Sequence, residues 1–170
     1  MTDRLIKIGL VISLFCLFGW GVTSFTKLEP CLTESLKDVH YILTLKQSFP
    51  FQNPIRRGDI VSIHGHKPQY VGDKPFAKRV MGLPGDKITQ SKGKLKIETK
   101  NTASQITFLT TLPLLDKTKE GKPLTPLSTI IVPSGYVFVV GDHLRSFDSR
   151  YEEFRLVSKD KIWGKAVLTW

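Results

Sequence analysis

The sequence contains little of what marks a metalloprotein or a disulfide-stabilised protein. The two cysteines, Cys16 and Cys31, lie in different surroundings, so we expect no internal disulfide. No Cys-x-x-Cys spacing occurs, and the four histidines form no convincing ligand set, since His64 and His66 are spaced as same-face residues of one strand. We therefore expect neither a metal nor a cofactor.

Positive charge is plentiful but is not concentrated anywhere in the chain. There are 25 Lys and Arg residues against 15 Asp and Glu, a formal net charge of +10, and no compact basic run occurs. Nucleic-acid-binding domains gather their basic residues on one helix or stripe. We therefore predict no nucleic-acid partner, and we explain the charge by a domain held beside an anionic membrane surface.

An uncharged apolar run lies near the N-terminus. Residues 8–25 (IGLVISLFCLFGWGVTSF) approach the roughly 20 residues that a membrane-spanning helix needs. Arg4 and Lys7 precede the run and place the N-terminus in the cytoplasm. The alternative is a cleaved signal peptide, but no convincing small-x-small cleavage site is present. We predict that residues 1–26 are a cytoplasmic tip and a retained single-pass anchor in the cytoplasmic membrane, and that residues 27–170 are a domain on the periplasmic side.

The domain is predicted to be mainly β, because no stretch after residue 26 has a long helical period. β-branched and aromatic residues indicate strands at residues 39–45, 60–63, 76–81, 94–97, 106–110, 136–140 and 164–170. The run 136–140 (YVFVV) is apolar throughout, which is typical of a buried strand. Residues 27–37 read as a short connection to the membrane, and residues 87–132 as a Lys- and Thr-rich β insertion without a core of its own.

Lys78 is the candidate for a catalytic side chain. It lies between the apolar pairs Phe76-Ala77 and Val80-Met81, and a tight Gly-Leu-Pro-Gly-Asp turn follows. An exposed lysine has a pKa of roughly 10.4, whereas burial favours the neutral amine, which is a base. A neutral lysine within hydrogen-bond reach of a serine activates that hydroxyl as a nucleophile. On these residues alone, Lys78 is either such a base or an ordinary surface lysine beside a turn.

Ser35 is the serine that such a base serves best, judged by its place in the chain. It lies between the predicted membrane segment and the first predicted strand. Thr33, two residues earlier, has a hydroxyl that can bind an oxyanion together with the Ser35 backbone N–H. The alternative is a polar linker serine with no catalytic role.

Four motifs, in order, resemble those of the type I signal peptidase family. Residues 78–86 (KRVMGLPGD) resemble its lysine box, and residues 141–151 (GDHLRSFDSRY) resemble its C-terminal box. Residues 57–61 (RGDIV) and 132–140 (VPSGYVFVV) are similar as well. The resemblance implies a fold of antiparallel β-sheets around a coiled β-barrel, with one N-terminal transmembrane helix.

The resemblance also implies a role for each matching residue. Ser35 corresponds to the nucleophile, Lys78 to the general base that later protonates the leaving amine, and Thr33 to the residue that completes the oxyanion hole. The partners that are implied are a protein substrate and membrane lipid. The matches that would orient the lysine or support the site are Ser146, Asp142, Asp148 and Arg150.

Departures from the usual motifs point to one branch of this family. Ser35 lies in Thr-Glu-Ser-Leu-Lys instead of Ser-x-Ser-Met-x-Pro, and residue 143 is His where Asn is usual. The Ser-Leu pair and the sequence Ser-Phe-Asp-Ser-Arg-Tyr at residues 146–151 resemble those of the TraF-type peptidases of conjugative transfer. The predicted function is therefore cleavage, or cyclisation, of a pilin or another exported precursor. The alternatives are a general signal peptidase and a non-catalytic assembly subunit of a transfer apparatus, whereas an autocleaving DNA-binding repressor is disfavoured by the membrane segment.

Overall fold

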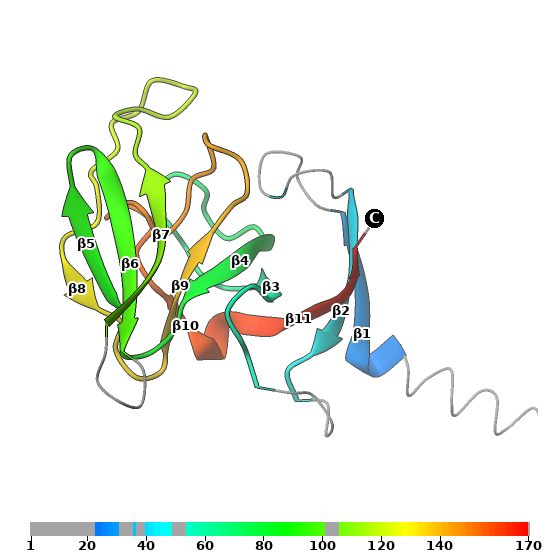
Figure 1. Ribbon diagram of the computed structural model, residues 1–170. Helices are drawn as coiled ribbons and strands as arrows, with labels where there is room; N and C mark the ends of the chain where they lie inside the picture. The colour runs from blue at the N-terminus through cyan, green and yellow to red at the C-terminus, as the bar shows by residue number, and fades with distance from the viewer. Residues whose placement is uncertain (1–22, 31–35, 37–39, 49–53, 101–105, 170) are drawn as a thin grey trace, which may run out of the picture.

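The computed structural model describes residues 23–30, 36, 40–48, 54–100 and 106–169 (Figure 1). Residues 23–25 are helical, and a 3-10 turn, η1 (Lys159–Lys161), precedes the last strand. The strands are β1 (Thr26–Pro30), β2 (Tyr41–Lys46), β3 (Ile60–Ile63), β4 (Phe76–Gly82), β5 (Lys87–Ser91), β6 (Lys94–Lys100), β7 (Ile106–Pro113), β8 (Ile130–Ile131), β9 (Tyr136–Val140), β10 (Val157–Ser158) and β11 (Ile162–Thr169).

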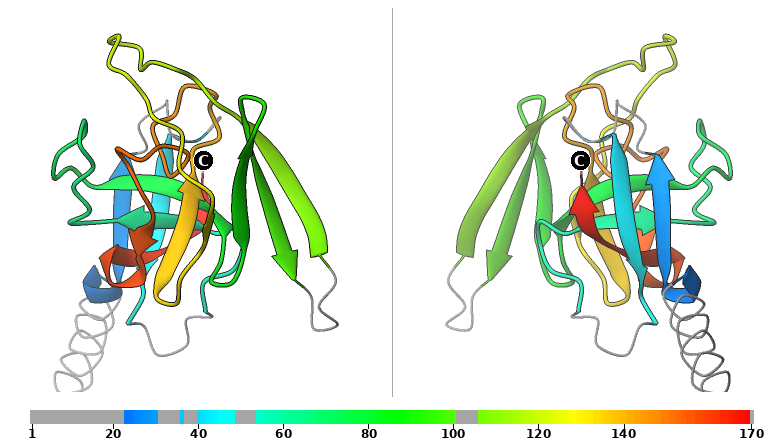
Figure 2. Two further views of the ribbon diagram at one scale, coloured as in Figure 1. Left: turned by 90° about the vertical axis from the view of Figure 1, so that its left-hand side faces the viewer. Right: turned by 90° about the vertical axis from the view of Figure 1, so that its right-hand side faces the viewer.

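These strands form two antiparallel sheets. The larger has seven strands in the order β1-β2-β11-β3-β4-β9-β10, and the smaller has four in the order β7-β6-β5-β8. Every strand pair in both sheets is antiparallel. The smaller sheet stands out to one side of the larger one (Figure 2). The prediction of a mainly β, antiparallel fold is confirmed.

Strand β9 joins the two hydrophobic cores because both of its faces are buried. Val137 and Val139 pack into the core of the larger sheet, together with Val61 of β3 and other apolar residues. Phe138 and Val140 alternate with them and pack into the core under the smaller sheet. Side chains of a strand point alternately to its two faces, so a strand covered on both sides is apolar at every position. The smaller sheet therefore shares its core with β9.

The N-terminal edge of the larger sheet differs from the prediction. Residues 27–37 are predicted as a connection, but their first part belongs to strand β1, which pairs with β2 in the register Leu28↔Leu43. That part of the prediction is wrong, because Lys27, Glu29 and Pro30 give this segment no apolar alternation. An edge strand tolerates such residues because only one of its sides carries ladder hydrogen bonds.

The predicted membrane anchor falls almost wholly outside the described residues, which begin at residue 23. Within the part of the chain that the structure describes, no helix has the length and apolar character needed to cross a membrane. Membrane anchoring therefore stays a prediction.

Candidate active site

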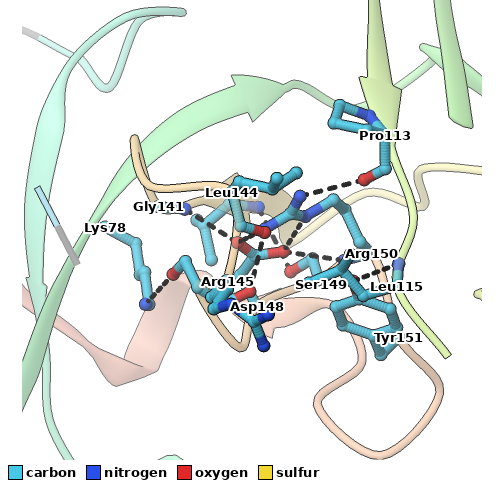
Figure 3. A network of polar contacts seen from close by, with 12 residues as sticks. Lys78, Pro113, Leu115, Gly141, Leu144, Arg145, Asp148, Ser149, Arg150 and Tyr151 are labelled. Carbon is cyan, nitrogen blue, oxygen red and sulfur yellow. Dashed lines mark hydrogen bonds and ion pairs between the residues drawn. The ribbon is translucent and has the colours of Figure 1, made fainter. Parts of the chain in front are cut away.

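Lys78 lies in the middle of the larger sheet. Its strand, β4, runs between β3 and β9, and Lys78 stands opposite Val61 of β3. The residue is only 5% exposed, and its Nζ donates a 2.6 Å hydrogen bond to the Oγ of Ser146 (Figure 3). The alternative of an ordinary surface lysine is therefore wrong.

Ser146 belongs to the loop at residues 141–151, which follows β9. Its side chain is buried, and its backbone is fixed from one side by Arg150, whose Nη2 donates to the Ser146 carbonyl at 2.8 Å. The same Nη2 donates to the Leu144 carbonyl at 3.2 Å, and Nη1 donates to the Pro113 carbonyl at 3.0 Å. One guanidinium thus holds the loop on both sides of residue 145 and ties it to the end of β7 (Figure 3).

A buried ion pair supports that guanidinium. Arg150 donates to both carboxylate oxygens of Asp148, from Nε at 2.8 Å and from Nη2 at 3.0 Å. The two residues are 2% and 0% exposed, and Asp148 also accepts the Gly141 N–H at 2.9 Å. This two-point geometry fixes direction as well as distance. The structure therefore brings Asp148 and Arg150 together with Ser146 and Lys78.

Arg150 is positively charged although it is buried. Burial lowers the pKa of Arg150, but the charge and the hydrogen bonds of Asp148 outweigh that effect and leave the pKa above its ordinary value. The neighbouring Tyr151 is a neutral phenol, since burial raises its pKa, and the Arg150 guanidinium faces its ring at 5.6 Å. The site therefore contains a fixed positive charge whose field is balanced by Asp148.

The turn after β4 is closed by the buried carboxylate of Asp86. Its Oδ2 accepts the Leu83 N–H at 2.6 Å and forms an ion pair with Arg57 Nη1 at 2.8 Å. Arg57 also donates to the Met81 carbonyl. A Cβ on Gly82 would lie 2.8 Å from Phe138 Cβ, so only glycine fits where β4 crosses β9. The turn therefore fixes the end of the strand that contains Lys78.

A second ion pair joins β4 to the loop. Arg79 donates from Nε and Nη2 to the two carboxylate oxygens of Asp142, at 2.8 and 2.7 Å. These hydrogen bonds raise the pKa of Arg79. Arg79 is not among the predicted site residues, although it follows Lys78 in the motif. The sequence offers one indication of this ion pair, the opposite charges of Arg79 and Asp142. Their proximity becomes visible only when β4 is paired with β9.

Comparison of the sequence with known proteins identifies the family. A family model described as "Signal peptidase, peptidase S26" matches residues 4–170. The chain belongs to the signal peptidase family, peptidase S26. It is 34% identical over 143 residues to signal peptidase I U of Bacillus subtilis (strain 168), a match that covers 81% of this chain and 69% of that protein. It is 33% identical over 134 residues to signal peptidase I of Bacillus caldolyticus, covering 77% and 69%.

Membership of this family makes the chain a serine endopeptidase of the signal peptidase I type. Among solved structures, a signal peptidase I from Enterococcus faecalis V583 matches with 25% identity, covering 66% of this chain and 97% of that one. The TM-score of that match is 0.42, which is too low to support an inference about this chain.

Two residues predicted for the peptidase site, Ser35 and Thr33, lie outside the described residues. Leu36, which follows Ser35 in the sequence, is described and is 1% exposed. It belongs to a buried apolar cluster with Ile42 of β2 and Ala77 of β4. Ala77 is the residue before Lys78, so the chain beside the predicted nucleophile packs onto the strand of the predicted base.

The described part of the peptidase site is suited to proton transfer. It contains a buried amine, a hydroxyl that is hydrogen-bonded to this amine, and a loop held by a buried ion pair. Within the described ranges, no group of three or more His, Cys, Asp or Glu side chains is placed to hold a metal ion.

Proposed function

We propose that the chain is a membrane-anchored endopeptidase with a Ser35–Lys78 dyad that cleaves a signal peptide from an exported precursor. The observation that carries the proposal is the burial of Lys78 with its Nζ 2.6 Å from Ser146 Oγ. The anchor would be the apolar segment at residues 8–25, with the N-terminus in the cytoplasm and the peptidase domain on the outer side.

The proposed mechanism uses only groups of this chain and one water molecule. Neutral Lys78 accepts the hydroxyl proton of Ser35 as the serine oxygen attacks the scissile carbonyl. The Thr33 hydroxyl and the Ser35 N–H stabilise the oxyanion. Collapse of the tetrahedral intermediate breaks the peptide bond, Lys78 gives its proton to the leaving amine, and water then hydrolyses the acyl-enzyme.

We expect Ser35→Ala and Ser146→Ala to have different effects on cleavage and on acylation by a serine-reactive probe. Ser35→Ala should abolish cleavage and should also prevent acylation by a serine-reactive probe, because the attacking oxygen is lost. Ser146→Ala should slow cleavage by about 10²-fold but should leave the acylation site intact, because its role is to orient the amine. Mass spectrometry of the probe-treated full chain in detergent measures both outcomes.

Ser146 is also the serious competitor for the nucleophile, since its hydroxyl already contacts Lys78. Its 3% exposure argues against attack on a bound substrate. Probe attachment to Ser146, with normal processing by Ser35→Ala, would reverse the assignment. Normal processing by both variants would mean that another group is the nucleophile, whereas no processing and no acylation by the wild-type chain would favour the non-catalytic alternative.

The substrate within this class has two candidates. Both curated relatives are signal peptidase I enzymes, which supports general precursor cleavage. The Ser35-Leu36 pair and the sequence of residues 146–151 support processing of pilin in conjugative transfer. Complementation of a cell depleted of its own signal peptidase is expected only for the general enzyme. For a pilin substrate, mass spectrometry separates the outcomes, because a cyclised product lacks one water relative to the cut linear chain.

A further inference from the structure

The larger sheet is curled, because β1 and β2 run across the direction of β3 and β4 (Figure 2). Strand β11 joins these two parts: it pairs with β2 from Gly164 to Thr169 and with β3 from Ile162 to Lys165. The register of β11 shifts once in each pairing, and irregularities of this kind bend a strand. The bend in β11 therefore carries β1 back toward β3.

A polar contact closes this curl between β1 and β3, although β2 and β11 lie between them in the strand order. Glu29 of β1 is 9% exposed, and its Oε2 accepts the hydroxyl of Ser62 of β3. Its Oε1 lies 3.0 Å from His64 Nε2 and 2.8 Å from Lys27 Nζ. The Ser62 side chain is buried and also contacts His64 Nε2 at 3.0 Å. These contacts hold β1 against β3.

Glu29 makes these contacts as a carboxylate. Burial raises its pKa, but the hydrogen bonds from Lys27 and Ser62, with the charges of Lys27 and His64, lower the pKa below its ordinary value. Hydrogen bonds to an ionised acceptor are shorter and stronger than those between neutral groups. Loss of the carboxylate would leave the buried Ser62 hydroxyl without this acceptor, which is costly for a buried polar group.

The contact between Glu29 and Ser62 lies next to the strand that contains the predicted base. Ser62 stands opposite Ala77 in the pairing of β3 with β4, and Ala77 immediately precedes that base. Leu36 belongs to the same buried cluster as Ala77. In the sequence, Glu29 precedes Ser35 and Leu36 follows it directly. The chain is therefore fixed on both sides of the predicted nucleophile, before it on β3 and after it beside β4.

We propose that Glu29 is a positioning residue for the reaction, whose contact with Ser62 and His64 sets the place of Ser35 relative to Lys78. The inference rests on the proposed function, because it takes Ser35 as the nucleophile and Lys78 as the base. Glu29 acts through the main chain of β1 and needs no contact with the reacting atoms. A displacement of about 1 Å can cost about 10²-fold in rate, so this contact should affect attack more than substrate binding.

Two substitutions of Glu29 test this role in the purified full chain in detergent. Glu29→Leu should lower kcat for a precursor by about 10- to 100-fold and leave KM within about twofold, because attack is impaired and binding is not. Glu29→Gln should keep kcat within about threefold of the wild type, because its amide oxygen still accepts the Ser62 hydroxyl. Acylation of Ser35 by a serine-reactive probe should slow in the same order.

Ser62→Ala removes the other partner of the contact and little volume, so it tests the inference even where Glu29→Leu does not fold. It should lower kcat by about tenfold. When it is combined with Glu29→Leu, the two losses should not add, because both substitutions remove one interaction. Glu98→Leu is the matched control, since Glu98 lies on β6 of the other sheet in an ion pair with Lys96 at 2.7 Å. It should leave kcat unchanged.

Two results would overturn the inference alone, provided that thermal unfolding shows the variants to be folded. One is a kcat in Glu29→Leu and Ser62→Ala that equals the wild-type value. The other is a rise in KM at constant kcat, which would mean that Glu29 serves substrate binding. A wild-type chain that cleaves the precursor but is never acylated at Ser35 would instead overturn the proposed dyad, and the inference with it.

Discussion

Replacing Lys78 with methionine is expected to slow cleavage by at least about a thousandfold, because in the proposed mechanism this side chain accepts the nucleophile's proton. Methionine keeps an unbranched apolar stem of similar length in the buried space beside Val61 and Ser146. The protein should therefore remain folded. Single-turnover cleavage of a precursor by the full chain, with thermal unfolding of the same preparation, measures both parts of the expectation.

The matched control is the same substitution at Lys96, which lies on β6 with its side chain 44% exposed. Lys96→Met should keep activity within about twofold, as is usual for surface substitutions away from a site. A folded Lys78→Met protein that retains more than about a tenth of the wild-type rate would show that another group is the base.

Replacing Asp148 with alanine is expected to lower the free energy of unfolding by about 3–5 kcal/mol, because it leaves the buried Arg150 charge without its partner. The Gly141 N–H loses its acceptor as well. Arg150 also holds the carbonyls of Leu144 and Ser146, so disorder at the guanidinium should reach Ser146, whose hydroxyl contacts Lys78. Urea unfolding of the purified protein measures the loss of stability.

Comparison with Asp142→Ala isolates the effect of burial on the contribution of an ion pair to stability. Asp142 forms the same two-point pair with Arg79, but those side chains are 23% and 33% exposed, so water screens the charges. Its loss should cost less than about 1 kcal/mol. The double variant Asp148→Leu with Arg150→Met should recover part of the stability lost in Asp148→Ala, because it leaves no unpaired buried charge. Equal costs for the two alanine variants would mean that the buried pair contributes no more than the exposed one.

Strands with mostly apolar, mostly buried residues were predictable from the sequence. Ile60–Ile63 and Tyr136–Val140 have the predicted bounds, because short runs of mostly apolar residues have few alternatives to a covered strand. β1 and β5 were not predicted. β5 buries only Ile88 among its residues and becomes a strand by pairing with β6, a partner that local composition does not reveal.

The residues of the site also divide into those that were predictable from the sequence and those that were not. Lys78 and Ser146 stand in motifs 68 positions apart, and the motifs predicted both before any contact between them was visible. Arg79 was not predicted, because its partner Asp142 comes beside it only when β4 pairs with β9. The catalytic roles of Ser35, Thr33, Lys78 and Ser146 stay predictions.

The order of strands in the larger sheet bears on how the enzyme matures. β11 follows every other strand in the sequence, yet it lies between β2 and β3 and joins the β1–β2 hairpin to the rest of the sheet. A chain that emerges N-terminus first makes this hairpin early, but the hairpin has no sheet to join until β11 arrives. Pairings between distant segments form late in folding. The two parts of the larger sheet, β1 with β2 on one side and β3 with β4 on the other, are therefore joined only once β11 has been made.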